Sequence, residues 1–490
     1  MSEKAIGRDW AARQNEEFCS SRANRIARNA VTATDVMQAA RDTSVMRGYH
    51  DTYGVRVPKT ADITNQRQSG RCWMFTAYNV ARHATMDFLD VDSFEFSQAY
   101  GMFYDKLEKA NAMLENVIAT AGLPADSREV QLVLEDGMGD GGYYHFAMNL
   151  IAKWGVVPKD AMPETACSKS SAQMDAQLER LLHRDAGILR RAHAEGEGED
   201  ELRALKEDML SGVYRMLAIC LGEPPARFDF VCTVGKRHKA DASKVKAVEP
   251  QKDEEPKDAG EKDGPKEQKL VLRDPDITPL EFAERYLPFD PHDYVSLVSM
   301  PGKTRPYGHA YHLTLTDSVV GGDPHHVLNV EPELLDQVAV NSLKAGVPVS
   351  MACDVMQEFP RHVDDFKYVL STDGMDLEGL FDVELGMGRD EMIDMCETGL
   401  THAMTFQGVE LDAKGTPKAW RVENSWGKDA GKDGYLIMSN DWFRLYGGEV
   451  DVRRSYVPND LLEIWDDESK DVEVEPWSGM GVALGVGRRD

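Results

Sequence analysis

The 490-residue sequence lacks several features that would assign it to a common class of protein. No apolar run approaches the roughly 20 residues that a membrane-spanning helix requires, and the first residues lack the apolar core of a secretory signal. The seven cysteines are scattered without a Cys-x-x-Cys pair, which disfavours a disulfide framework and a zinc knuckle. No internal repeat is visible. We therefore expect a large protein of a reducing cytoplasm.

Positive charge is also scarce, because 56 Lys and Arg face 84 Asp and Glu and leave a net charge of −28. A surface that binds nucleic acid needs clustered cations, so nucleic acid is not expected as the main partner. Hydrophobic residues make up 42% of the chain, which is enough for a packed core and excludes a wholly disordered protein.

Composition divides the chain into segments. Residues 1–172 form an N-terminal segment and a helical half, since apolar residues recur at spacings of three and four, as in residues 69–84. Residues 173–286 are interpreted as a helical insertion that includes a solvated charged loop at 236–269. Residues 287–465 contain short β-favouring runs, and residues 466–490 form a tail. The sequence predicts an α+β protein with a helical half before a mainly β half.

Cys72 is a candidate nucleophile at the first turn of the predicted helix 69–84. Unpaired amide N–H groups and the helix dipole at such a position stabilise a thiolate. Gln66, six residues upstream, has an amide that can join the Cys72 backbone N–H in binding an oxyanion. A lone cysteine beside Trp and Phe is more often a core residue, so the hypothesis depends on a base elsewhere in the chain.

His402 and Asn424 supply that base and its orienting group. His402 opens one apolar run, and Asn424 ends another 22 residues later, just before Trp426. If the two runs are adjacent strands, the Asn424 oxygen can fix the His402 tautomer while Trp426 shields the pair from water. Either residue alone fits a core histidine or a turn asparagine. The order Gln, Cys, His, Asn favours a catalytic set.

Two other motifs receive simpler interpretations. The pairs His309-x-x-His312 and His325-His326 lack the Glu of a His-Glu-x-x-His site, so neither a metal nor a cofactor is expected. The glycine-rich segment 136–142 is predicted to be a loop in which Gly141 and Gly142 let a substrate backbone approach closely.

Taken together, these motifs make the chain resemble the papain-like cysteine peptidases, and within them the bleomycin hydrolase and aminopeptidase C family. Ser69 stands where papain has Cys, and Arg71 where it has Ser or Ala. The separation of 330 residues from Cys72 to His402 matches the large insertions of that family. The closer match covers most of the chain and rests on residues 64–73, 96–98, 105–108, 139–142, 153–159, 277–279, 353–354 and 401–427.

The resemblance implies a papain-like fold, with a helical half that carries Cys72 and an antiparallel β half that carries His402 and Asn424. It further implies a cytosolic thiol aminopeptidase that acts on peptides with a free N-terminus. It also implies a homohexamer and a tail, residues 475–484, that enters the cleft and brings Leu484 to the substrate, with Trp426 as a further substrate-binding residue. This chain adds residues 485–490, so we expect trimming near Leu484 or a rearranged tail. The alternatives are a papain-like endopeptidase with an open cleft and, less favoured, a ring-shaped nucleic-acid-binding scaffold.

Overall fold

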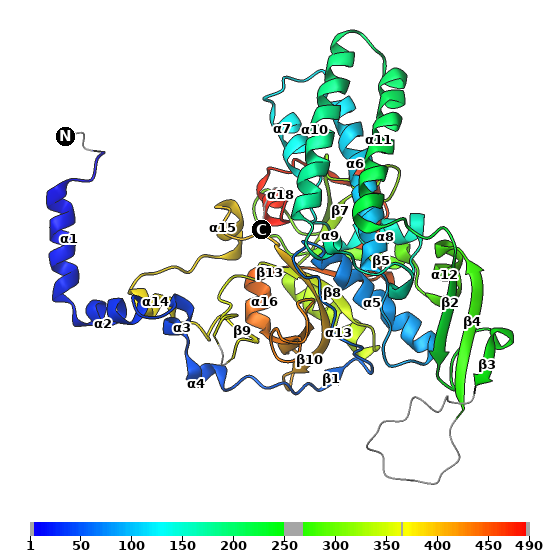
Figure 1. Ribbon diagram of the computed structural model, residues 1–490. Helices are drawn as coiled ribbons and strands as arrows, with labels where there is room; N and C mark the ends of the chain where they lie inside the picture. Colours follow the sequence, from blue (N-terminus) through cyan, green and yellow to red (C-terminus); the bar gives the residue numbers. More distant parts are fainter. Residues whose placement is uncertain (1–3, 249–267, 364–365, 487–490) are drawn as a thin grey trace.

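The structure is a computed structural model that describes residues 4–248, 268–363 and 366–486 (Figure 1). Helices gather in one half and strands in the other, with the sheet coming later in the chain, so the expected α+β order is confirmed. No helix in these residues is both long and apolar enough to cross a bilayer.

The helical half is built around α5 (Cys72–Leu89), which is almost entirely buried, including its polar residues Asn79 and Arg82. Such a helix can only be central to a core. Its first turn lies beside the β half, where α5 contacts β8 and β10. The other helices of this half are α6 (Gln98–Ala119), α7 (Arg128–Asp136), α8 (Tyr144–Trp154), α9 (Ala166–Lys169), α10 (Ala172–Ala194), α11 (Glu199–Leu221) and α12 (Pro279–Tyr286).

Helices α10 and α11 occupy the first part of residues 173–286, the segment interpreted as a helical insertion, and a three-stranded sheet follows within the same segment. Both helices pack against α6 through a stripe of leucines that includes Leu178, Leu182 and Leu217. In Figure 1 they rise above α5 and extend the helical half away from the sheet. The apolar faces of these two helices are therefore buried by packing on α6.

The β half is one large mixed sheet, so the expected antiparallel arrangement holds only in part: β5 pairs with β7, β6 with β14 and β9 with β12 in parallel. In the residues described, its strands run in the order β14-β6-β7-β5-β13-β8-β10-β11-β12-β9, with β1 (Val55–Arg56) added to β10. Helices α13 (Pro332–Lys344) and α16 (Asn440–Tyr446) cover a core that contains Phe406, Trp420 and Trp442. The strands are β5 (Tyr294–Val298), β6 (His309–Leu313), β7 (His326–Asn329), β8 (Val349–Cys353), β9 (Val369–Leu370), β10 (His402–Leu411), β11 (Pro417–Glu423), β12 (Tyr435–Ser439), β13 (Gly447–Arg453) and β14 (Val472–Val474).

The prediction of a loop for residues 236–269 is wrong in part. A 3-10 turn at Ala242–Lys244 leads into β3 (Val245–Val248), which pairs with β4 (Lys269–Ile277) beside β2 (Phe228–Val234). The strand β3 lies at the edge of this small sheet. An edge strand is held by backbone hydrogen bonds to one neighbour and tolerates lysine, so a polar composition did not predict β3. Residues 249–267 lie outside the described part of the chain.

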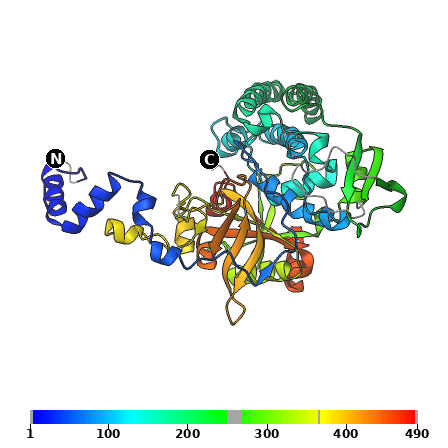
Figure 2. The same ribbon diagram turned by 60° about the horizontal axis from the view of Figure 1, so that its bottom comes forward.

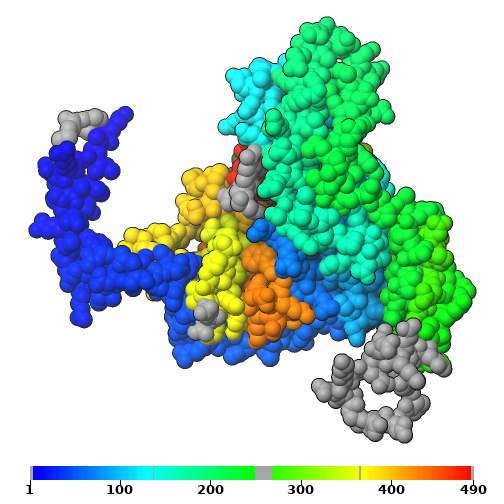
Figure 3. Space-filling model, viewed as in Figure 1, coloured from blue at the N-terminus to red at the C-terminus, as the bar shows by residue number. Residues whose placement is uncertain are grey.

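The N-terminal helices form an arm that projects from the body, as Figures 1 and 2 both show. No residue of α1 (Arg8–Ser20) or α2 (Arg22–Val31) is buried, and Trp10, Phe18 and Ile26 are exposed. Helices α3 (Val36–Ala40) and α4 (Thr43–Met46) return the chain to the body next to α14 (Leu377–Phe381). In the space-filling view the arm stands apart from the rest of the molecule (Figure 3).

The tail ends in a short helix, α18 (Gly479–Ala483), that packs on α15 (Arg389–Asp394); α17 (Asn459–Trp465) precedes it. The Val486 N–H donates to the Gly481 carbonyl at 3.0 Å, and the Gly485 N–H donates to the Val482 carbonyl at 3.1 Å. These two bonds, with Gly485 at φ +93°, make a Schellman turn. The described tail is therefore a closed, hydrogen-bonded turn.

Candidate active site

Cys72 is the first residue of α5, and it lies in a cavity of about 550 Å³. No side chain caps the N-terminus of α5, so its first amide N–H groups point toward the cavity end of the helix and favour a thiolate. The same cavity is lined by His402 and by the tail residues Leu484 and Val486. The predicted nucleophile, its base and the tail thus share one cavity.

His402 and Asn424 come together at the ends of two paired strands. Strands β10 and β11 are antiparallel, with Thr405 opposite Glu423. The start of β10, which is His402, therefore lies beside the end of β11, which Asn424 follows. His402 Nε2 lies 2.9 Å from Asn424 Oδ1. With Nε2 engaged in this bond, Nδ1 is the ring nitrogen left to exchange a proton with a thiol.

Burial controls the charge of His402. The side chain is 6% exposed, and this desolvation lowers its pKa to about 4, against an opposing contribution from the Asn424 hydrogen bond. The imidazole is therefore neutral at pH 7 and able to accept a proton. The Trp426 ring lies 4.7 Å from the imidazole, centroid to centroid, and covers one face of it.

Ser425 joins the two sides of the site, a role that the sequence did not suggest. Its N–H donates to Asn424 Oδ1 at 2.7 Å, and its hydroxyl donates to Gln66 Oε1 at 2.6 Å. Gln66 Nε2 donates to the Ser69 carbonyl at 2.7 Å, which uses one of its two hydrogens. The second hydrogen is not engaged by a described residue, but Gln66 is buried and is not among the residues that line the cavity, so its predicted oxyanion role stays a prediction.

Arg71, which replaces the small residue of papain, has a structural task. Its side chain is 1% exposed and makes a two-point ion pair with Glu164, at 3.1 and 2.9 Å. It also donates to Ser69 Oγ at 2.9 Å. Arg71 thereby fixes the approach to Cys72 without entering the cavity. Glu164 lies 93 residues away, so no local pattern could have revealed this pair.

The glycine loop is held by two lysines of α6. Lys106 Nζ binds Asp140 at 2.8 Å and the Met138 carbonyl at 2.8 Å, and Lys109 Nζ binds the Gly141 carbonyl at 2.6 Å. Asp140 in turn accepts the Gly70 N–H at 3.0 Å. These bonds fix the loop against the segment that carries Cys72.

Gly141 and Gly142 differ in what surrounds them. A Cβ at Gly141 would meet no atom within 4 Å, so this position is open to the cavity that it lines. A Cβ at Gly142 would lie 2.6 Å from the Trp73 ring, so Gly142 is required by packing. The expected close approach of a substrate backbone therefore fits Gly141, whereas Gly142 positions the loop.

Leu484 and Trp426 are placed differently from a simple substrate contact. Leu484 is 1% exposed and packs with Val298 and Ile393, although it borders the cavity. Trp426 lies on His402 and is not among the residues that line the cavity. Residues 487–490 are outside the described chain, so trimming near Leu484 stays a prediction.

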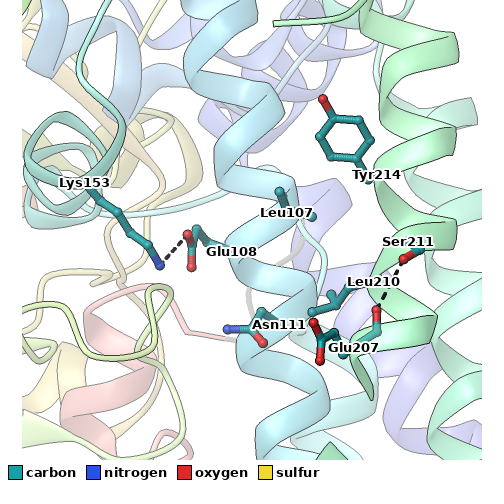
Figure 4. Close-up of a pocket in the computed structure, with 8 residues that line it drawn as sticks. All are labelled: Leu107, Glu108, Asn111, Lys153, Glu207, Leu210, Ser211 and Tyr214. Carbon is teal, nitrogen blue, oxygen red and sulfur yellow. Dashed lines mark hydrogen bonds and ion pairs between the residues drawn. The ribbon is translucent and has the colours of Figure 1, made fainter. Parts of the chain in front are cut away.

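The histidine pairs do not form a metal centre in the described residues, where no three His, Cys, Asp or Glu side chains are placed to hold one ion. A second hollow, of about 500 Å³, lies between α6, α8 and α11 (Figure 4). Its Lys153 and Glu108 form an ion pair of 2.7 Å, and neither cysteine nor histidine lines it. The cavity with Cys72 is the candidate active site.

Comparisons with known proteins agree with this geometry. The family model of the Peptidase C1-like family matches residues 5–252 and 263–481. An Aminopeptidase C of Listeria monocytogenes is 36% identical over 86% of this chain and 86% of its own length. An Aminopeptidase C of Lactococcus lactis subsp. cremoris is 34% identical over 96% of this chain and 98% of its own.

A solved structure supports the fold as well. The crystal structure of PepW from Lactobacillus rhamnosis is 32% identical to this chain and superposes with a TM-score of 0.87, covering 98% of this chain and 99% of that one. The expected α+β, papain-like fold is confirmed by the family match and by this neighbour.

Proposed function

The chain belongs to the Peptidase C1-like family and is a papain-like cysteine aminopeptidase, and we propose that Cys72 is its nucleophile, with His402 as base. The observation that carries the residue assignment is the shared cavity, in which Cys72 at a helix N-terminus meets a neutral His402 held by Asn424 at 2.9 Å. Cys72 attacks the carbonyl of the first residue of a peptide and forms an acyl-enzyme.

The remaining groups act at defined steps of this acyl transfer. The second amide hydrogen of Gln66 and the Cys72 backbone N–H hold the oxyanion. His402 takes the thiol proton, passes it to the leaving amine, and then activates the water that releases the amino acid. Asn424 keeps the imidazole in the tautomer that allows both transfers.

We propose that the tail makes the site an exopeptidase that acts on peptides with a free N-terminus. Leu484, Gly485 and Val486 line one side of the cavity, and the Leu400 N–H, near His402, donates to the Ala483 carbonyl at 2.8 Å. This hydrogen bond holds the tail turn next to the start of β10. The turn therefore leaves little room for substrate residues that come before the residue whose carbonyl is attacked. This arrangement favours an aminopeptidase over an open-cleft endopeptidase.

We expect N-acetylation of an aminoacyl reporter substrate to lower kcat/KM by at least about 100-fold, because the added group meets the tail turn. The measurement compares free and acetylated forms of one reporter, before and after thiol alkylation. Alkylation should stop both reactions. Equal hydrolysis of the two forms would instead indicate an open-cleft endopeptidase.

We also propose a homohexamer located in the cytoplasm. None of the seven cysteines, all of which lie in the described part of the chain, forms a disulfide, and this supports a reducing compartment. The N-terminal arm supports self-association, because Trp10, Phe18 and Ile26 are 49%, 38% and 58% exposed on helices that bury none of their own residues.

The hexamer predicts a particle of six chains of 54.7 kDa in analytical ultracentrifugation. Changing Trp10 and Ile26 together to glutamate should lower the measured mass, since a charge at each position opposes burial in an interface. Val231→Glu, at a position 51% exposed on β2, is the matched control and should leave the mass unchanged. A monomer of the native chain would contradict the proposal.

A further inference from the structure

Strand β13 places two carboxylates on the floor of the active-site cavity. Glu449 and Asp451 are two residues apart, so their side chains leave the same face of the strand. They lie opposite Ala352 and Ser350 of β8, and all four residues line the cavity that contains Cys72 and His402. Neither carboxylate takes part in the acyl transfer described above.

The two carboxylates differ in their partners. Asp451 accepts hydrogen bonds from Ser296 Oγ at 2.6 Å and from Ser350 Oγ at 2.7 Å. Glu449 is 3% exposed, and no described residue donates a hydrogen bond to it or pairs with its charge. The guanidinium of Arg389 lies against Gly448, but it donates to the carbonyls of Ser299 and Leu445.

A buried carboxylate without a partner is costly, and such groups in native proteins need an explanation. Burial, together with the neighbouring Asp451, holds the pKa of Glu449 well above its usual range. Burial thus disfavours the ionised form of this carboxyl, and a cation bound beside it would stabilise that form.

The walls of the cavity also favour a cation. The lysine in the lining, Lys109, already binds Asp105 and the carbonyls of Gly139 and Gly141. The lining carboxylates, besides the two of β13, are Glu135, Asp140, Asp175, Glu179 and Asp317. Lys106 pairs with Asp140 and Asp175, and His312 pairs with Asp317, but carboxylates still outnumber cations at this cavity, and the excess negative charge attracts a cation.

Ala403, Ala352 and Glu449 form one row across strands β10, β8 and β13. Ala403, which follows His402, lies opposite Ala352 on β8, and Ala352 lies opposite Glu449 on β13. Two strand spacings put Glu449 about 10 Å from Ala403 along this row. Both alanines are partly exposed in the cavity, so the row is an open path.

This distance decides which substrate group can reach Glu449. The α-amino group is joined to the attacked carbonyl through a single carbon atom and stays near Cys72. The cationic head of lysine or arginine sits at the end of a long flexible stem. We propose that Glu449 is a specificity-determining residue that binds the basic side chain of the N-terminal Lys or Arg of a substrate peptide, an inference that rests on the proposed function.

The test compares arginine with citrulline reporters, which share a shape and differ in charge. We expect native enzyme to prefer arginine, and Glu449→Gln to reduce the ratio of the two kcat/KM values by about 10- to 100-fold, mostly through KM for arginine. The citrulline rate should stay near the native value. Glu179→Gln removes one charge from the same cavity and is the matched control, with a ratio close to native.

Binding gives the same comparison without turnover. Arginine amide and citrulline amide are titrated by calorimetry into Cys72→Ala and into the double variant with Glu449→Gln. Tighter binding of arginine amide that disappears in the double variant supports the proposal, even where no reporter is hydrolysed and the proposed function itself fails. An arginine-to-citrulline ratio that is near one in native enzyme, or unchanged by Glu449→Gln, overturns it.

Discussion

Replacing Cys72 with alanine should lower kcat/KM by about a millionfold, the loss expected when a covalent nucleophile is removed from a catalytic set. The thiol is the group that forms the acyl-enzyme, and no other cysteine lines the cavity. The measurement is hydrolysis of a free aminoacyl reporter at saturating and limiting substrate. Residual activity above about one per cent of native would overturn the assignment.

Two controls separate catalysis from folding in this experiment. Cys19→Ala changes an exposed cysteine of α1 and should leave the rate unchanged. Cys72 is only partly buried, so its replacement should shift the thermal midpoint little. A variant that loses activity together with its cooperative unfolding transition would not count in favour of the nucleophile.

The pairing of His402 with Asn424 illustrates what sequence can provide. The two residues are 22 apart at the ends of consecutive apolar runs, and a hairpin of that length brings its outer ends together. Cys72 was found in the same way, since helix periodicity and the upstream Gln66 are both local signals. Local spacing was therefore sufficient to propose these residues, and the structure places Cys72 and His402 at one cavity.

Residues that shape the cavity depend on contacts distant in sequence. In the sequence, nothing distinguishes Glu449 and Asp451 from other residues of a strand. They line the cavity because β13 pairs with β8, which lies about a hundred residues earlier in the chain. The sequence does not distinguish Gly142 from Gly141, and only the Trp73 ring packed beside Gly142 shows that a side chain is excluded there. Strand order and side-chain packing are tertiary properties that a single sequence does not display.

His402→Ala and Asn424→Ala should separate the base from the group that orients it. His402→Ala removes the proton acceptor, and we expect kcat/KM to fall by about 10⁴-fold or more. Asn424→Ala leaves the acceptor but frees the ring that a 2.9 Å bond holds, and we expect a loss of about 10- to 100-fold. His309→Ala, at an exposed histidine, is the control for both.

The pH profile gives a readout that structural damage would not reproduce. Burial lowers the pKa of His402 to about 4 and the Asn424 hydrogen bond opposes that shift, so the acid limb of kcat/KM should lie near pH 4 in native enzyme. Below it the imidazole is already protonated and cannot take the thiol proton. Asn424→Ala removes the contribution that raises the pKa, so its acid limb should move to lower pH. A limb that stays in place, or moves upward, would mean that Asn424 does not act through His402.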